Sequence, residues 1–398
     1  MQAQLQQKYE RDTVYFTSGK KKVNIPFNLV HNLIIIPVQI NDSQPLNFIL
    51  DSGVRNTLIT RLYYSDAFSL NAADKITLQG LGSGHKVEAL FSSGNVMSMP
   101  GIQGDNHQVY VLMEDVFNLS HRMGMPVHGI IGYDIFKNFI VKINYATKIL
   151  TLYSPDTKLK KKRKAEEFPL MIEGNKAYVQ GKVRQQNGDT LNVKLVLDTG
   201  ASNTLSLYLP TNSKLTLPPK VLDTYIGRGL GGDIHGKIGR LDAFVLGKYE
   251  LFDLPAAYPD EEAIKLALNI ANRNGNLGSD ILNRFTVILD YPHNKLTLIP
   301  NSKYKKPFNY NLAGFEIATP LPGTKLYIVS NVTDNTPAKH VGIQPGDQII
   351  NINGQDCNEL QLPEVLNIFD SKPGRKIRLR LKRNQQVIDV DFVLQSRI

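Results

Sequence analysis

The chain of 398 residues contains a single cysteine, Cys357. A lone thiol forms no disulfide within the chain and no cysteine-based metal site, so we expect it to be a buried filler of the core. The eight histidines include no His-Glu-x-x-His arrangement, a sequence signature of zinc peptidases. We therefore expect neither a metal nor another cofactor.

The sequence also lacks a long apolar run and the motifs of several other enzyme classes. No stretch has the length and apolarity of a transmembrane helix, so we expect no membrane-spanning segment. Gly82-Ser83-Gly84 lacks the Gly-x-Ser-x-Gly spacing of a nucleophile elbow, which argues against a serine hydrolase. The glycines between Gly227 and Gly232 do not open a helix in a βαβ unit, so we expect no nucleotide site.

The formal net charge of +10 comes largely from two basic runs, Lys20-Lys21-Lys22 and residues 158–164. Runs of this kind are usually solvated, and no aromatic residues alternate with the basic ones as they do in nucleic-acid-binding segments. We expect no nucleic-acid partner. The second run lies at the join between two halves of the chain, where we expect a flexible and cleavable linker.

Two short stretches repeat one pattern, an apolar strand that runs into Asp-(Ser/Thr)-Gly. Asn47 to Leu50 lead into Asp51-Ser52-Gly53, and Val193 to Leu197 lead into Asp198-Thr199-Gly200. An Asp after apolar residues and before a Gly lies where a buried strand breaks into a turn, with its carboxylate at the edge of the core. The two Asp residues are 147 positions apart, and we interpret them as the halves of a carboxylate pair.

The repeat continues beyond these two motifs. Gly129-Ile130-Ile131-Gly132 recurs 146 positions later as Gly275-Asn276-Leu277-Gly278. The glycine-rich tip Gly80-Leu81-Gly82 recurs 149 positions later as Gly229-Leu230-Gly231. Several landmarks in one order at nearly one spacing indicate an internal duplication. Each copy exceeds a hundred residues, so we expect a duplicated lobe and not a solenoid.

These residues resemble the aspartic proteases of the pepsin and retropepsin superfamily, and more closely the bacterial members built from retropepsin-like lobes. The resemblance covers roughly Val23 to Pro300 and implies a mainly β fold with two homologous lobes in a pepsin-like bilobal arrangement. It implies an aspartic endopeptidase acting on polypeptide substrates, with Asp51 and Asp198 as catalytic residues. The implied supporting residues are Ser52, Gly53, Thr199 and Gly200, and the implied flap residues are Gly80, Leu81, Gly82, Gly229, Leu230 and Gly231.

The chemistry of such a pair explains why two lobes are needed. Two carboxylates held about 3 Å apart do not both ionise, so they share one proton and titrate as a coupled pair. The ionised member takes a proton from water while the protonated member polarises the scissile carbonyl. We expect Gly53 and Gly200 to let each backbone approach the other lobe's carboxylate, and the Ser52 and Thr199 hydroxyls to bond across the lobe interface.

The two copies are unequal, because Arg55 stands in the first copy where the second has Ser202. A guanidinium beside the pair would favour ionised carboxylate and move its titration to lower pH, whereas one that points to solvent would have no effect. We favour the solvent orientation. The alternative to an enzyme is a catalytically inactive, duplicated peptide-binding or scaffold protein that keeps the two Asp residues as a vestigial pair.

From residue 308 the sequence changes character. Residues 336–354 contain a short helix pattern, a Pro345-Gly346-Asp347 turn and a strand that ends in the hairpin dipeptide Asn353-Gly354. This stretch resembles a PDZ domain of the bacterial protease-associated type. The resemblance implies that a C-terminal peptide ligand adds as a strand at a sheet edge, here Glu316 to Thr319, with its carboxylate on backbone amides. The implied receiving loop is Leu312, Ala313, Gly314 and Phe315. The alternative is an intramolecular brace whose groove is unused.

We predict an organisation of three domains acting as a monomer. The expected segments are an N-terminal tail at 1–22, a first protease lobe at 23–156, a basic linker at 157–167, a second lobe at 168–302 and a PDZ domain at 308–398. We also expect helices at 261–272 and 114–122. The opening residues Met1-Gln2-Ala3-Gln4 resemble what remains after cleavage at a small-residue site. We therefore expect an exported bacterial protein, periplasmic or at the cell surface, whose signal peptide is absent from this chain.

Overall fold

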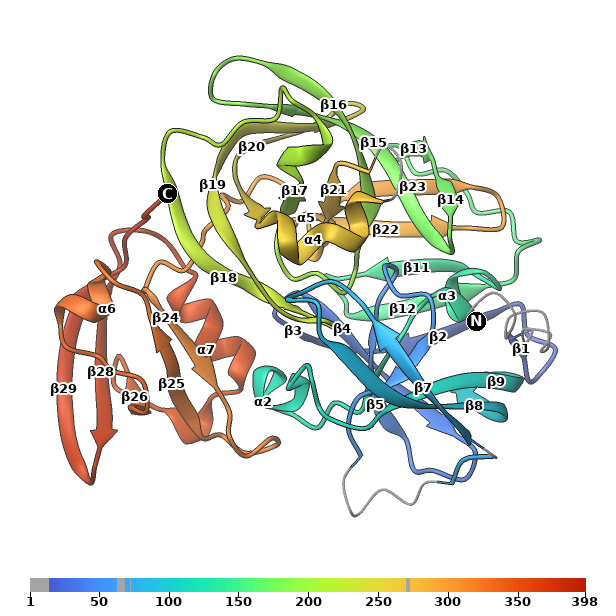
Figure 1. The fold of residues 1–398 in the computed structure, drawn as a ribbon, viewed down its shortest axis with the longest axis horizontal. Helices are drawn as coiled ribbons and strands as arrows, with labels where there is room; N and C mark the ends of the chain where they lie inside the picture. The colour runs from blue at the N-terminus through green and yellow to red at the C-terminus, as the bar shows by residue number, and fades with distance from the viewer. Residues whose placement is uncertain (1–13, 63–68, 72, 270–272) are drawn as a thin grey trace. The chain divides into compact units, whose positions relative to one another are not determined.

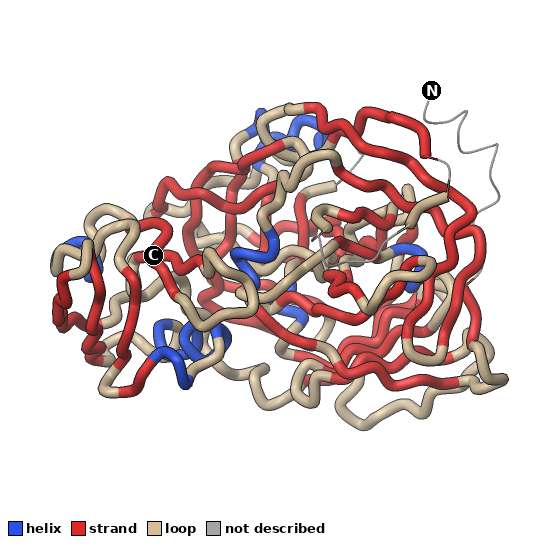
Figure 2. Tube along the Cα trace, turned by 90° about the horizontal axis from the view of Figure 1, so that it is seen from below, coloured by secondary structure: helices blue, strands red, loops and turns tan. Residues whose placement is uncertain are grey.

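The computed structural model describes residues 14–62, 69–71, 73–269 and 273–398 (Figure 1). They form two compact units. The first holds the chain up to Phe117 and again from His128 to Lys306, and the second holds Asn118–Val127 with Pro307–Ile398. Strands make up 49% of the residues and helices 10%, which confirms the expected mainly β fold. Figure 2 shows the few short helices among the strands.

The first copy of the repeat forms a nine-stranded sheet in the order β1-β9-β6-β10-β5-β4-β8-β7, with β3 paired to β4 and a further β8–β9 pairing. β4 reads Leu-Ile-Ile-Ile-Pro-Val-Gln-Ile and is buried almost throughout, as expected for a central strand. The strands are β1 Val14–Phe16, β3 Asn28–Val30, β4 Leu33–Ile40, β5 Leu46–Leu50, β6 Thr57–Ile59, β7 Ala73–Gln79, β8 Lys86–Met99, β9 Ile102–Leu112 and β10 Gly129–Ile131.

The second copy repeats this arrangement in an eight-stranded sheet, ordered β14-β15-β16-β21-β17-β20-β19-β18, with a further β15–β19 pairing. The strands are β14 Met171–Glu173, β15 Lys176–Arg184, β16 Thr190–Leu197, β17 Leu205–Leu207, β18 Val221–Gly229, β19 Gly232–Leu246, β20 Tyr249–Pro259 and β21 Gly275–Leu277. In the described part of the first unit, the short helices are α3 Tyr133–Phe136, η1 Leu209–Thr211, α4 Glu261–Leu268 and α5 Ser279–Leu282. The helix expected at 261–272 is therefore present as α4, and residues 270–272 lie outside the described part.

A third sheet joins the copies with three strands from each, in the order β13-β23-β22-β11-β12-β2. In its middle pair Val141 lies opposite Leu289, and Ile143 opposite Val287. The 146-position repeat exchanges these two pairs, so the lobes meet about a local twofold axis within one chain. The strands are β2 Lys22–Pro26, β11 Ile140–Asn144, β12 Ile149–Tyr153, β13 Glu166–Pro169, β22 Phe285–Asp290 and β23 Lys295–Pro300.

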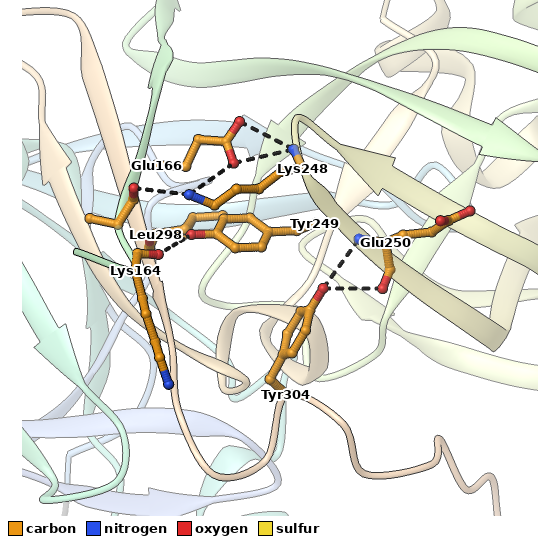
Figure 3. A network of polar contacts seen from close by, with 8 residues as sticks. Lys164, Glu166, Lys248, Tyr249, Glu250, Leu298 and Tyr304 are labelled. Carbon is orange, nitrogen blue, oxygen red and sulfur yellow. Dashed lines mark hydrogen bonds and ion pairs between the residues drawn. The ribbon is translucent and has the colours of Figure 1, made fainter. Parts of the chain in front are cut away.

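A polar network fastens the β19–β20 hairpin to this central sheet (Figure 3). The Tyr249 hydroxyl donates to the carbonyl of Lys164 at 2.7 Å and to that of Leu298 at 3.0 Å. The Lys248 amide donates to both carboxylate oxygens of Glu166 at 3.2 Å. Lys164 and Glu166 belong to the segment 157–167 that we expected to be a flexible linker. Its C-terminal end is thus bound to the second lobe.

The second unit contains a sheet in the order β24-β25-β26-β28-β29, with β27 paired to β26. Along β28 every second residue is buried, as the alternation of Ile377, Leu379 and Leu381 with basic residues predicts. The elements are α2 Leu119–Met123, β24 Phe315–Ala318, β25 Tyr327–Val332, α6 Pro337–His340, β26 Gln348–Ile352, β27 Gln355–Asp356, η2 Cys357–Glu359, α7 Leu362–Phe369, β28 Lys376–Arg383 and β29 Gln386–Val393. Cys357 is buried, as expected.

Two features differ from the expected organisation. The N-terminal tail predicted at 1–22 contains β1, which pairs antiparallel with β9 from Val14 to Phe16. The helix predicted at 114–122 is shorter and later, at α2, and it belongs with the second unit although its sequence lies between two strands of the first lobe. The chain therefore leaves the first unit after Phe117 and returns to it at His128.

Candidate active site

Each Asp of the predicted pair directly follows a buried strand. β5 ends at Leu50 and β16 at Leu197, so Asp51 and Asp198 begin the turns. The Asp51 amide donates to the carbonyl of Ile131 at 2.8 Å, and the Asp198 amide donates to the carbonyl of Leu277 at 3.0 Å. Those acceptors lie on β10 and β21, which pair in parallel with β5 and β16. The repeated segments that end in Gly132 and Gly278 therefore brace the two Asp turns.

The braces end in glycines because the backbone of the Asp turn lies against them. A Cβ atom on Gly132 would clash with the carbonyl oxygen of Asp51, and one on Gly278 would clash with that of Asn203. The Gly278 amide also donates to the carbonyl of Thr204 at 2.7 Å, and this bond fixes the turn after Asp198. Any side chain at either glycine would displace the backbone of the neighbouring Asp turn.

The hydroxyl groups of Ser52 and Thr199 bond across the lobe interface. The Ser52 hydroxyl donates to the carbonyl of Leu197 at 2.7 Å and accepts from the Thr199 amide at 3.0 Å. The Thr199 hydroxyl donates to the carbonyl of Leu50 at 2.7 Å and accepts from the Ser52 amide at 2.9 Å. Four hydrogen bonds thus hold the two Asp turns in a reciprocal arrangement, and both side chains are buried.

The two carboxyl groups lie next to each other and hydrogen-bond. A Cβ atom on Gly200 would clash with the carboxyl of Asp51, and one on Gly53 would lie 3.1 Å from the carboxyl carbon of Asp198. Each glycine amide donates to the Asp of its own turn, Gly53 to Asp51 Oδ1 at 2.6 Å and Gly200 to Asp198 Oδ1 at 3.1 Å. The glycines therefore provide both the space and a hydrogen-bond donor.

The pair is electrostatically unequal. Burial, followed by the negative charge of Asp198, raises the pKa of Asp51 from 3.8 to about 7. The Gly53 hydrogen bond and the charge of Lys176 oppose this rise. One proton therefore stays on the pair at mildly acidic pH, which is the state that general acid/base chemistry between two carboxylates requires.

A cation that sequence analysis missed acts on the pair. Lys176 begins β15 after a hairpin turn, and burial and the charge of Arg273 lower its pKa, while Asp198 and Asp51 raise it. Arg55, which we had considered for this role, is exposed and is not among the groups that shift the pKa of Asp51. The β14–β15 hairpin of the second lobe corresponds to the β3–β4 hairpin of the first, and Lys176 occupies the position of the buried Leu33. Only an alignment of these two hairpins would have indicated Lys176.

The two predicted flap tips touch each other. Gly80-Leu81-Gly82 connects β7 to β8, and Gly229-Leu230-Gly231 connects β18 to β19. The Gly231 amide donates to Leu81 at 2.8 Å, and the His85 amide donates to Gly231 at 3.1 Å. Gly82 has a φ of +126° and faces Gly232 so closely that a Cβ atom would clash with the Gly232 backbone. The glycines are therefore required for the two tips to meet.

The first tip is also held by the second lobe's helix. The Gly82 amide donates to the carbonyl of Ala263 at 2.9 Å, at the start of α4. Leu81 packs against the buried cluster of Tyr208, Ile264 and Ala267. The structure therefore holds the two predicted flap tips together through contacts from both lobes.

Two further observations bear on cofactors and membranes. Within the described residues, no cluster of three or more His, Cys, Asp or Glu side chains has the geometry of a metal site. In the same part of the chain, no helix has the length and apolarity needed to cross a membrane.

In the second unit, the loop Leu312 to Phe315 precedes the edge strand β24. The carbonyls of Leu312, Ala313 and Gly314 accept hydrogen bonds from Gln395, Ala338 and Thr333. Among the described residues, the amides of Leu312 and Ala313 donate no backbone hydrogen bond, so the loop contains two backbone donors without a backbone partner. Gly314 has a φ of +86° and lies against Thr336, which explains glycine at this position.

The sheet edge beside this loop is not open along the predicted length. Thr319 follows β24, and its amide donates to the carbonyl of His121 at 2.9 Å, while the Gly323 amide donates to Gly124 at 3.0 Å. Gly124 lies so close to Leu362 of α7 that a Cβ atom would be 3.0 Å from the leucine side chain. The expected open edge at 316–319 is therefore wrong at Thr319, which the chain's own segment Asn118–Val127 occupies.

Comparison with known families agrees with this architecture. Residues 36–135 and 179–281 match the model of the aspartyl protease family, and together they make up just over half of the chain. Residues 328–383 match that of the PDZ domain. No curated protein matches the chain. The chain belongs to the aspartyl protease family and carries two copies of its domain followed by a PDZ domain.

Proposed function

We propose that the protein is an aspartic endopeptidase that hydrolyses peptide bonds between the carboxyl groups of Asp51 and Asp198. The observation that carries the proposal is the joining of these two carboxyl groups, one from each lobe, by the reciprocal hydrogen bonds of Ser52 and Thr199. A binding protein has no need to hold two carboxyl groups side by side at the cost of raising the pKa of one of them.

The reaction follows from one shared proton. The oxygen of a water molecule bonds to the carbonyl carbon, one water proton passes to the ionised carboxylate, and the proton of the other carboxyl passes to the carbonyl oxygen. The resulting diol then collapses as the C–N bond breaks. The leaving nitrogen takes the proton from the first carboxyl, and a diol hydroxyl returns a proton to the second. The products are a carboxylic acid and an amine, and the pair is restored.

In the proposed mechanism, the flap tips control the entry of the substrate. Because the two tips bond to each other and to α4, a polypeptide enters only after they separate. Their closure over a bound chain would exclude bulk water and position the scissile carbonyl against the pair. We also propose that one chain suffices, since both Asp turns and both halves of the central sheet belong to it.

Incubation with a mixed peptide library at pH 5 to 6, followed by mass spectrometry, distinguishes a peptidase from an inactive scaffold protein. The peptidase generates new peptide termini, and in water enriched in ¹⁸O each new carboxyl group acquires one ¹⁸O atom. A scaffold protein leaves the library unchanged. Incorporation of more than one ¹⁸O at early times would indicate a different chemistry.

The PDZ domain, we propose, receives the free C-terminus of a short peptide. Support comes from the amides of Leu312 and Ala313, which have no backbone partner among the described residues and lie beside the edge strand β24. Because the segment Asn118–Val127 occupies the edge from Thr319 onward, the space for a ligand ends near Ala318. A strand that fits this edge is about four residues long.

A further inference from the structure

The two lobes differ at one position of the brace. In β10, Ile130 lies opposite Ile49, and in β21 the equivalent Asn276 lies opposite Val196. Both positions come two residues before the brace glycine, beside the strand that ends in the Asp. The duplication therefore placed a polar side chain next to one member of the pair and an apolar side chain next to the other.

The hydrogen bonds of Asn276 determine which way its amide points. Its Oδ1 accepts from Arg273 Nη2 at 2.5 Å and from the Tyr208 hydroxyl at 3.1 Å. A guanidinium group has no acceptor, so this end of the amide must be the oxygen. The amide nitrogen then faces Asp198 Oδ2 at 2.7 Å. An NH₂ group donates only, so this carboxyl oxygen accepts.

Asp198 thus receives donors on both oxygens, Asn276 on Oδ2 and the Gly200 amide on Oδ1. Among the described residues, Asp51 receives the Gly53 amide on Oδ1 and also hydrogen-bonds with the carboxyl of Asp198. Hydrogen bonds to a carboxylate favour its charged form. The extra side-chain donor on one member therefore breaks the symmetry of the pair.

The support behind Asn276 is buried and cationic. Arg273 is buried, donates to the Tyr208 hydroxyl at 3.1 Å, and lies 5.3 Å from the centre of the Tyr208 ring. An arginine stays protonated in proteins, so this support does not change with pH. Among the described residues, Lys176, Tyr208 and Tyr291 interact electrostatically with the pair, and Arg273 acts on Lys176 and Tyr208.

We propose that Asn276, held by Arg273 and Tyr208, is a positioning residue that keeps Asp198 ionised and leaves the shared proton on Asp51. This inference rests on the proposed peptidase function. It assigns the two roles in that reaction: Asp198 takes the proton from water, and Asp51 gives its proton to the carbonyl oxygen. Without the amide donor, the proton would distribute over both carboxyl groups.

The test replaces Asn276 by leucine, which has a similar volume but no donor, and uses Ile130→Leu in the first lobe as the matched control. Titration of ¹³C-labelled Asp carboxyl groups by NMR needs no turnover, and the signals are assigned by their loss in Asp51→Asn and Asp198→Asn. In the wild type, we expect the signal of Asp51 to titrate near pH 7. In Asn276→Leu, both signals share that step, and the first ionisation of the pair moves up by about one pH unit or more.

The acid limb of the pH profile of kcat/KM moves in the same direction in Asn276→Leu and stays in place in Ile130→Leu. Arg273→Met removes the donor that holds the side-chain amide of Asn276, so this variant shifts the acid limb as well. Arg273→Lys keeps a donor and therefore restores part of the wild-type profile. Unchanged titration in both Asn276→Leu and Arg273→Met overturns the inference. The expected titration without peptide cleavage would refute the proposed function and leave the proton assignment standing.

Discussion

Ser52 and Thr199 each hold the backbone of the other lobe, through four hydrogen bonds between 2.7 and 3.0 Å. Neither lobe alone satisfies these groups, because each hydroxyl donates to a carbonyl of the opposite strand end. The same contacts that join the lobes therefore set the spacing of Asp51 and Asp198. Stability of the lobe interface and catalytic geometry depend on the same two side chains.

Thr199→Val removes the hydroxyl while keeping the shape of the side chain. The amide of Ser52 and the carbonyl of Leu50 lose their partners in a buried site, so the free energy of unfolding falls by about 2 to 4 kcal/mol. Urea denaturation measures this, and the exposed Thr190→Val serves as the control. A loss below about 1 kcal/mol would mean that the four bonds do not hold the lobes together.

The pH dependence follows from the raised pKa of Asp51, about 7. Above that pH the pair loses its shared proton, so kcat/KM falls by about tenfold per pH unit. The native state also binds this proton more tightly than the unfolded chain, so stability from this group is full below about pH 4 and is lost as pH rises through about 7.

Thermal melting from pH 4 to 8 shows the stability effect when wild type is compared with Asp51→Asn, which cannot titrate. The melting temperature of the wild type should fall relative to the variant as pH rises. A constant difference across this range would contradict the raised pKa.

The repeat explains how much of this site was predictable. The Asp turns, the flap glycines and the braces are local patterns that occur twice, so each copy supports the interpretation of the other. Lys176 and Arg273 have no such pattern, because their relation to the pair arises from segments far apart in the sequence that come together only in the folded lobe. Asn276 was visible as a break in the repeat, but its hydrogen bond to Asp198 was not.

The position of Asn118–Val127 was also beyond sequence analysis. This segment lies between two strands of the first lobe, yet it bonds to Thr319 and Gly323, about two hundred positions later in the chain. Nothing in its local pattern predicts that pairing. Contacts of such large sequence separation follow from the tertiary fold and not from periodicity.

Gly82→Ala tests the meeting of the flap tips. A Cβ atom at this position clashes with the Gly232 backbone, and the φ of +126° is unfavourable for alanine. We expect kcat/KM to fall by about tenfold or more because closure is impeded. Gly227→Ala, where the added Cβ meets nothing within 4 Å, is the matched control. Equal activity of both variants would show that the tips need not meet.

Peptide length tests the ligand site of the PDZ domain. Calorimetry on the full chain with Asp198→Asn, which prevents cleavage, would compare a tetrapeptide and an octapeptide that end in the same isoleucine. Because Asn118–Val127 occupies the edge from Thr319 onward, we expect their affinities to agree within about twofold. Amidation of the C-terminus should abolish binding. An octapeptide that binds more than tenfold tighter, or an amidated peptide that still binds, would contradict the proposed site.

The most direct test of the account removes each carboxylate separately. Asp51→Asn and Asp198→Asn should each lower peptide hydrolysis at pH 5 to 6 by about a thousandfold or more, because each supplies half of one acid-base device. Both variants should remain folded by thermal melting, and the exposed Asp42→Asn should retain wild-type activity. Hydrolysis within tenfold of wild type by either active-site variant would show that the pair does not carry the reaction.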